Sequence, residues 1–304
     1  MTSTTTTPTA AEDRAVLQRV SKPRLILRRF RRNRLAVTGA VILLVLTALA
    51  LFGPYVSPWE YAEIDFLSLK EAPSAEHWFG TDTAGGDIFA LTIHGLGRSL
   101  QIGVIASVLT TIIAAFVGAG LAYLGGKGEK VGVWIMDMLL VVPSFLFLCI
   151  ISSNASNTSG WLWLVFAIVV FGWMLYARVI RAVATSLRER EYIAAARYMG
   201  VRWYVVLWRH MIPNLGSVLV INTVLGVITA IEAETTLSFV GFGITPPDTS
   251  LGVLIKEGAN SMLSAPWILL IPMTLLLLLL LAMLWINNGL EDALNPSSDA
   301  GGKA

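Results

Sequence analysis

The sequence predicts an all-α membrane protein with about six transmembrane helices, and three observations carry this prediction. The 304 residues are 55% hydrophobic and only 14% charged, with a mean hydropathy of +0.70, outside the range of soluble domains. About six apolar stretches reach the roughly 20 residues that a helix needs to cross a bilayer. The unbroken leucine run at 275–281 lacks the alternation of a barrel strand, so helices remain as the spanning structure.

Apolar stretches divide the chain into regions. The expected spans are residues 35–56, 99–124, 131–152, 161–180, 215–231 and 266–286. The expected regions are a basic tail at 1–34, a first helix at 35–56, an outer loop at 57–97, a membrane core at 98–290 with a polar loop at 184–213, and a tail at 291–304.

The basic segment before the first span admits more than one interpretation. Its arginines are Arg24, Arg28, Arg29, Arg31, Arg32 and Arg34. Because apolar residues are interleaved with them, the segment could form a short amphipathic helix on the anionic inner leaflet, or it could simply anchor the N-terminus inside. A cleaved secretory signal ending near Ala50 is disfavoured, because the apolar run continues through Phe52 to Tyr55 and is long enough to span.

The distribution of lysine and arginine predicts the orientation, since short loops rich in these residues stay in the cytoplasm. Basic residues gather before the first span, at Lys127 and Lys130 after the second, and along 178–209 after the fourth. The loop at 57–97 is instead acidic. With six spans, both termini are expected on the cytoplasmic side.

The sequence offers no catalytic, cofactor or metal site. Cys149 is the only cysteine, so no disulfide or paired-thiol metal site can form within the chain. His77, His94 and His210 are kept apart by the expected topology. The Gly-Gly-Asp triplet ending at Asp87 lies in the outer loop without a partner aspartate at bilayer depth, which argues against an intramembrane aspartyl protease. No Walker phosphate loop is present, and nothing indicates a nucleic-acid partner.

Three acidic residues near or within the spans need an explanation, because a charge at bilayer depth is costly and often functional. Asp137 lies inside the third span, where it could pair across helices or line a watery cavity. Glu232 and Glu234 lie near the outer end of the fifth span, and a two-residue separation points them to opposite sides of a helix. They could be exposed at the helix end. Alternatively, Asp137 and Glu234 could serve an ion-coupled secondary transporter.

The polar loop at 184–213 lies between two long apolar runs and predicts a helix-turn-helix at the cytoplasmic surface. Gly200 supplies the left-handed residue that ends a first helix, residues 203–211 can form a second, and Pro213 marks the start of the next span. Three alanines at 194–196 would let a partner's backbone approach closely. A plain positively charged connection between spans is the alternative.

This loop resembles the coupling loop of the integral membrane permeases of ATP-binding-cassette importers. That motif reads EAA, three residues, Gly, nine residues, Ile, one residue and Leu-Pro. The residues on this spacing are Ala195, Ala196, Gly200 and Pro213. Ala194 and His210 stand where the motif has Glu and Ile, but both variants are usual in the peptide-importer branch, as are Glu191 and Arg197.

Further motifs extend the resemblance, specifically to the C-type subunit of dipeptide and oligopeptide importers. The segment at 77–82 resembles the family's H-x-L-G-T-D motif, and the segments LSFVGFG at 237–243 and GLEDALNP at 289–296 also match. Gly86 stands where the family usually has Arg, which is a departure.

The resemblance implies a non-catalytic half-channel in the bacterial cell membrane that imports di- or oligopeptides, with haem or nickel chelates as alternative solutes. It implies a second homologous permease, an external solute-binding protein, and two ATP-binding subunits or one fused ATPase chain that hold ATP and Mg²⁺, so this chain would bind no cofactor. The implied site residues are Glu191, Ala195, Ala196, Arg197, Gly200, His210 and Pro213 for ATPase coupling; Asp137, Glu234, Leu237 and Phe239 for the pathway or gate; and His77, Gly80, Thr81 and Asp82 for docking of the binding protein.

Overall fold

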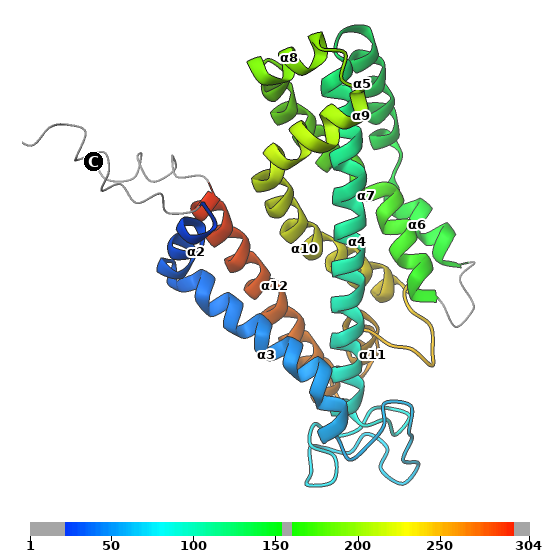
Figure 1. Cartoon of the computed structure of the whole chain (residues 1–304). Helices are drawn as coiled ribbons and strands as arrows, with labels where there is room; N and C mark the ends of the chain where they lie inside the picture. The colour runs from blue at the N-terminus through cyan, green and yellow to red at the C-terminus, as the bar shows by residue number, and fades with distance from the viewer. Residues whose placement is uncertain (1–21, 154–159, 295–304) are drawn as a thin grey trace, which may run out of the picture.

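The protein is a tall helical bundle with an irregular loop at one end and a short surface hairpin at the other (Figure 1). A computed structural model describes residues 22–153 and 160–294, in which β-pairing is limited to two isolated bridges. Expectations for residues 1–21, 154–159 and 295–304, which include most of both tails, lie outside the described residues. We call the two ends of the bundle the α8 end, after the helix of the hairpin, and the loop end.

Five described helices are long and apolar enough to cross a membrane, and a bent pair makes a sixth crossing if it counts as one span. The long helices are α3 (Arg34–Val56), α4 (Ile88–Leu124), α7 (Gly160–Arg188), α10 (Gly216–Val240) and α12 (Trp267–Leu294). The predicted all-α fold with about six spans is therefore confirmed.

The first two spans begin at capped helix ends. Helix α2 (Lys22–Arg32) stops at Asn33, whose side-chain oxygen accepts from the amide of Ala36 at 3.2 Å and so starts α3 in a new direction. Helix α4 is started by Asp87, whose carboxylate accepts from the amide of Ala90 at 2.8 Å. The predicted outer loop at 57–97 and second span at 99–124 were wrong at their common boundary, because this cap starts α4 eleven residues before the expected span (99 against 88).

The third span is broken, whereas the sequence predicted a continuous helix at 131–152. Helices α5 (Gly126–Val141) and α6 (Ser144–Ser153) meet at an angle of 66°. Val142 is extended, with φ −68° and ψ 124°, as the residue before a proline prefers, and Pro143 has no amide hydrogen to continue the helix.

The fifth span is longer than expected because the hairpin's second arm runs directly into it. The arm consists of α9 (Trp203–Val205), the π-helical η1 (Val206–Met211) and the 3₁₀ segment η2 (Ile212–Leu215), and α10 follows without interruption. The segment between the expected fifth span at 215–231 and sixth span at 266–286 also contains a helix. This helix, α11 (Leu251–Ser261), is started by Ser250, whose hydroxyl accepts from the amide of Val253 at 3.2 Å.

Small residues set the packing between α4 and α7 at the α8 end. Their facing surfaces contribute the buried alanines Ala114, Ala115, Ala119, Ala122, Ala177 and Ala184. Without a hydrophobic driving force between helices in lipid, such residues allow close backbone approach and dispersion contact. The closest approach is at Gly118, where an added Cβ would lie 2.5 Å from the carbonyl oxygen of Ala177.

We predict that Gly118→Ala destabilises the bundle by about 1–3 kcal/mol, because the methyl group must push α4 and α7 apart. The thermal unfolding temperature of the detergent-purified protein would measure this effect. Gly120→Ala is the matched control, since no atom lies within 4 Å of a Cβ at that position. Equal unfolding temperatures for the two variants would contradict the close packing.

Candidate functional site

The surface hairpin turns at Gly200 through a complete set of helix-ending hydrogen bonds. Helix α8 (Glu191–Tyr198) ends with the amide of Gly200 donating to the carbonyl of Arg197 at 3.0 Å and that of Val201 donating to the carbonyl of Ala196 at 3.1 Å. This pair of bonds defines a Schellman turn, which needs a left-handed residue. Gly200 provides it with φ +73°, as the sequence predicted.

One face of α8 is fixed to the bundle and the other is free. Ile193 and Ala196 are buried in the same hydrophobic cluster as residues of α4 and α7, together with Leu207 from the second arm. Ala195 is exposed on the opposite face. This chain's own core already covers Ala196, and its expected part in coupling to a partner stays a prediction.

The free face of the hairpin is aromatic, which the sequence reasoning missed. Its exposed large side chains are Tyr192, Tyr198, Met199, Trp203, Tyr204 and Trp208. We call this set the hairpin surface. Tyr198 is 92% exposed and Met199 75%, so neither contributes to this chain's core. The signal that could have found them is the density of aromatic residues in a polar segment, since aromatic residues are enriched at interfaces.

The end of the second arm has a wider helical turn before Pro213. Because proline lacks an amide hydrogen, the regular ladder cannot continue through it, and the chain passes through π-helical and 3₁₀ turns. The side-chain amide of Asn214 donates to the carbonyl of His210 at 2.6 Å, which satisfies one carbonyl there. His210 is half-buried and Pro213 is exposed.

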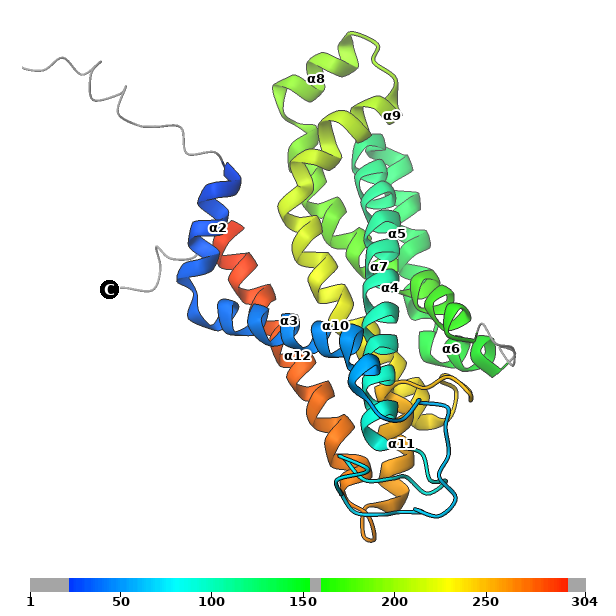
Figure 2. The same cartoon turned by 60° about the horizontal axis from the view of Figure 1, so that its bottom comes forward.

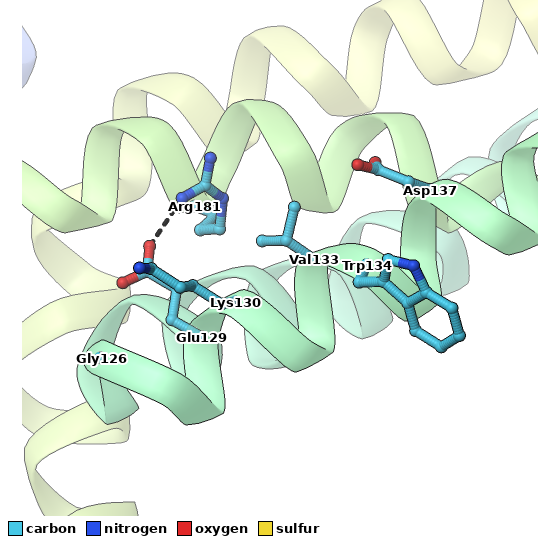
Figure 3. A pocket seen from close by; sticks show the side chains of 7 residues that line it. All are labelled: Gly126, Glu129, Lys130, Val133, Trp134, Asp137 and Arg181. Atoms are coloured by element: carbon cyan, nitrogen blue, oxygen red, sulfur yellow. Dashed lines mark hydrogen bonds and ion pairs between the residues drawn. The ribbon is translucent and has the colours of Figure 1, made fainter.

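A cluster of charges connects α4, α5 and α7 near the α8 end, and Figure 3 shows its Glu129–Arg181 pair. Glu129 of α5 accepts from Arg181 at 2.6 Å and lies 3.4 Å from Arg188, both on α7. Arg188 also donates to the carbonyl of Ala122 on α4 at 3.0 Å. Arg197 of α8 lies over the ring of Tyr123, 5.0 Å from its centre. Glu129 pairs with both arginines in a half-buried position, so these ion pairs stabilise the structure more than a solvent-exposed ion pair would.

Asp137 forms an ion pair with Arg178 of α7. It also lines a pocket of about 460 Å³ beside the charge cluster, together with Glu129, Val133 and Arg181. Pairing across helices was one of the sequence-based alternatives for Asp137, and the structure supports it. Any role in a pathway stays a prediction.

Glu234 is fully buried near the loop end of α10, so the interpretation as an exposed helix-end acid was wrong for it. Its carboxylate accepts from the hydroxyls of Ser238 at 2.6 Å, Ser250 at 2.5 Å and, more weakly, Ser99 at 3.4 Å. These serines come from α10, from the start of α11 and from α4. Hydroxyl donors compensate a buried carboxyl group, so Glu234 joins the three helices. Glu232 is exposed on the opposite face, as the helical spacing predicted.

The two other expected gate residues, Leu237 and Phe239, differ in burial. Leu237 is fully buried in a cluster with residues of α4 and α7, whereas Phe239 is 52% exposed. Of the pair, only Phe239 could therefore contact a transported solute or a partner without rearrangement of the bundle.

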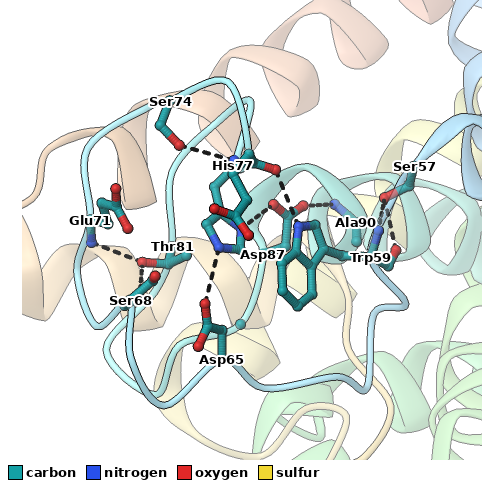
Figure 4. A network of polar contacts seen from close by, with 12 residues as sticks. Ser57, Trp59, Asp65, Ser68, Glu71, Ser74, His77, Thr81, Asp87 and Ala90 are labelled. Atoms are coloured by element: carbon teal, nitrogen blue, oxygen red, sulfur yellow. Dashed lines mark hydrogen bonds and ion pairs between the residues drawn. The ribbon is translucent and has the colours of Figure 1, made fainter.

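The loop end is held by a polar network around His77 (Figure 4). The imidazole of His77 is buried, 2.9 Å from a carboxylate oxygen of Asp87 and 3.6 Å from one of Asp65, and it stacks on Trp59. A backbone hydrogen bond from Leu67 and the Ser68 and His77 side chains lower the pKa of the Asp65 carboxyl. Because Asp87 also caps α4, the network fixes the loop on that helix.

His77, Gly80 and Thr81 are buried inside this loop, and their expected part in docking the binding protein stays a prediction. Thr81 donates to the carbonyl of Ser68 at 2.5 Å and accepts from the amide of Glu71 at 2.8 Å, which makes it a scaffold residue. Asp82 is half-buried and accepts from the amide of Gly86 at 2.8 Å. The motif shapes the loop from within.

A second polar cluster, not predicted from the sequence, connects α4 to the chain after α10. Asp248 lies 2.8 Å from His94 and 2.8 Å from Arg98. Partial burial alone would raise the pKa of Asp248, but the hydrogen bond from His94 and the charge of Arg98 outweigh it and lower that pKa. Tyr61 of the loop stacks on His94 at 3.7 Å. Within the described residues, no group of three or more potential ligands converges on a metal position.

Membrane-length helices that carry a surface hairpin at one end suit a subunit of a membrane transport system. The family described as the binding-protein-dependent transport system inner membrane component matches residues 107–295, and the N-terminal transmembrane domain of oligopeptide transport permease C matches residues 23–73. The chain belongs to this family of transport permeases.

Two relatives show how far the similarity extends. The oligopeptide transport system permease protein OppC of Mycobacterium tuberculosis (strain H37Rv) is 44% identical over 278 residues, covering 91% of this chain and 96% of the relative. The protein of the same name from Bacillus subtilis (strain 168) is 34% identical over 269 residues, covering 88% and 87%.

We predict that Gly200→Val abolishes uptake by the assembled transporter while membrane insertion is unchanged. A β-branched residue strains the left-handed turn by roughly 1–2 kcal/mol and displaces α8 from the bundle. Gly200→Asn should retain more activity, because asparagine tolerates this conformation.

Solute uptake in proteoliposomes, with insertion scored by protease protection, would measure both variants. Gly216→Val is the control, since a Cβ meets nothing within 4 Å at either glycine and only Gly200 has a positive φ. Near-normal uptake by Gly200→Val would count against the turn's role.

Proposed function

We propose that the chain is the permease subunit of an ATP-driven importer of di- or oligopeptides, forms half of the translocation pathway, and transmits motion from ATPase partners through the hairpin surface. The observation that carries this proposal is the hairpin itself, with one face buried in the bundle and an exposed aromatic face beside Ala195. The OppC proteins of M. tuberculosis and B. subtilis, named as oligopeptide permeases, support the solute class.

The orientation follows from the charges. Arginines and lysines crowd the α8 end, and the acidic loop at 57–87 occupies the other end. By the positive-inside rule the α8 end and both termini are cytoplasmic, in a bacterial cell membrane. Glu191, Arg197, His210 and Pro213 then lie on the ATPase side with Gly200.

The assembly contains four kinds of subunit. A second homologous permease completes the channel, two ATP-binding subunits or one fused ATPase chain dock at the hairpin surface, and an external solute-binding protein delivers the peptide to the loop end. ATP and Mg²⁺ are held by the ATPase partners, and this chain needs no cofactor of its own. Docking at the loop end uses the outer surface that the His77 network shapes, where Trp78, 42% exposed, is one of the exposed aromatic groups.

The pathway side of the chain is marked by hydroxyl groups at bilayer depth. A cavity of about 290 Å³ between α4, α6, α7 and α10 is lined by Ser107, Thr110, Tyr176 and Thr229 among others. Tyr176 and Thr229 share a hydrogen bond of 3.0 Å. Hydroxyl groups can both donate and accept hydrogen bonds, so they suit the amide and carbonyl groups that all peptides share. The pathway can therefore accept peptides with different side chains.

Two other functions fit fewer observations. The same architecture could import haem or nickel chelates. However, the hydroxyl and apolar side chains that line the cavity do not favour a metal chelate. An ion-coupled transporter would use Asp137 and Glu234, yet Asp137 is neutralised by Arg178 and Glu234 accepts hydrogen bonds from three serines.

We predict that a cysteine at Ala195 crosslinks to an ATPase subunit in membranes and that one at Ala196 does not. The two side chains are adjacent in sequence, but Ala195 is exposed and Ala196 is 4% exposed. Cys149→Ser provides a background without other thiols. Immunoblotting after bifunctional maleimide treatment would measure the yield. Equal crosslinking at both positions, or none at Ala195 across several partner positions, would undermine docking at this face.

We predict that peptide uptake requires ATP hydrolysis and disappears when the ATPase subunits are omitted from proteoliposomes. Radiolabelled peptide accumulation under an imposed proton gradient would distinguish the two transporter classes. If the purified permeases alone accumulate peptide, and Asp137→Asn or Glu234→Gln eliminates that uptake, the ion-coupled function replaces the proposed one.

A further inference from the structure

Helix α2 and the first residue of α3 together carry five exposed arginines without partners among the described residues. Arg24, Arg28, Arg31, Arg32 and Arg34 are exposed, and no hydrogen bond or ion pair engages their guanidinium groups within 22–153 and 160–294. The charges around Glu129 and Asp248, by contrast, are paired within the bundle. These arginines are therefore free to bind an anionic group that the described residues do not supply.

The structure holds α2 rigidly in place. Asn33 caps α3 and donates to Asp292 near the end of α12 at 3.0 Å. Phe30 packs against α12 where Gly289 leaves room: an added Cβ there would lie 3.3 Å from the phenyl ring. As a result α2 bends away from α3 and lies against the end of α12, and the two views agree on this arrangement (Figures 1 and 2).

The surface beside these arginines is apolar as well as basic. Leu27 is 57% exposed and Leu25 40%, and Leu35 at the first turn of the membrane span α3 is 57% exposed. Helix α2 leads directly into a membrane span, and its exposed leucines lie beside guanidinium groups. It therefore presents both the apolar and the basic groups that an interfacial lipid contact requires. An acidic protein surface would satisfy the charge but would leave the leucines beside a span exposed to water.

We propose that α2 binds the anionic phospholipid headgroups of the leaflet at the α8 end, with Arg28, Arg31 and Arg32 on phosphate groups and Leu27 in the acyl boundary. The contact anchors the joint between α3 and α12 at the membrane surface. It is independent of the proposed solute and of the hairpin surface, because neither Phe30 nor Asn33 touches α8.

The test uses the full chain with Cys149→Ser and Leu27→Cys, labelled with an environment-sensitive fluorophore and placed in nanodiscs. In phosphatidylcholine with phosphatidylglycerol, acrylamide quenching should be about two-fold lower than in phosphatidylcholine alone, because each arginine near an anionic surface adds attraction. Arg28→Gln with Arg31→Gln should abolish this difference. A label at Leu69, in the outer loop and 54% exposed, should show none.

Lys127→Gln with Lys130→Gln is the matched control, since it removes two exposed charges from the same end and should leave the difference intact. Circular dichroism and gel filtration verify that each variant is folded. The proposal is overturned if quenching is the same in both lipids, if the lysine pair and the arginine pair act alike, or if shielding arises only when ATPase subunits are added. The last outcome would make α2 a protein-docking surface.

Discussion

The burial of one face of the hairpin is the constraint on which the rest of the structure depends. Ile193, Ala196 and Leu207 are packed into the same cluster as α4 and α7, so a force on the exposed face is delivered to two membrane spans at once. Burying the side chain of Ile193 or Leu207 away from water contributes roughly 1.5–3 kcal/mol. Without that packing, the hairpin would move independently of the helices, and a force on the hairpin surface could not tilt the bundle.

At the loop end of the bundle, hydrogen bonds and ion pairs between buried or half-buried polar side chains connect the helices. Glu234 connects α10 to α4 and α11 through serine hydroxyls, and Asp248 connects the segment between α10 and α11 to α4 through His94 and Arg98. Helices α4 and α10 thus carry contacts at both ends. An assembly in which the hairpin moves as a unit and the loop end responds fits this arrangement, because rigid helices transmit displacement between packed ends.

Sequence reasoning succeeded where one residue type has one physical use. The apolar stretches predicted the spans, and Gly200 predicted a left-handed turn because few other residues adopt it. It failed where tertiary contacts decide. The bend at Pro143 lay within an apolar stretch, the early start of α4 depends on the Asp87 cap, and the burial of His77 and Ala196 depends on neighbours distant in the chain. A motif identifies which residues matter, but it does not say which face they occupy.

The central claim is that the hairpin and its two spans move as one body when ATP binds. Double electron–electron resonance on the reconstituted transporter tests it, with spin labels replacing Tyr198 on α8 and Lys127 in the first turn of α5, directly after α4. This intrachain distance should be the same with and without ATP, while the distance from Tyr198 to the second permease changes. A change in the Tyr198–Lys127 distance on ATP binding would show that the hairpin flexes on its own, and it would contradict the account.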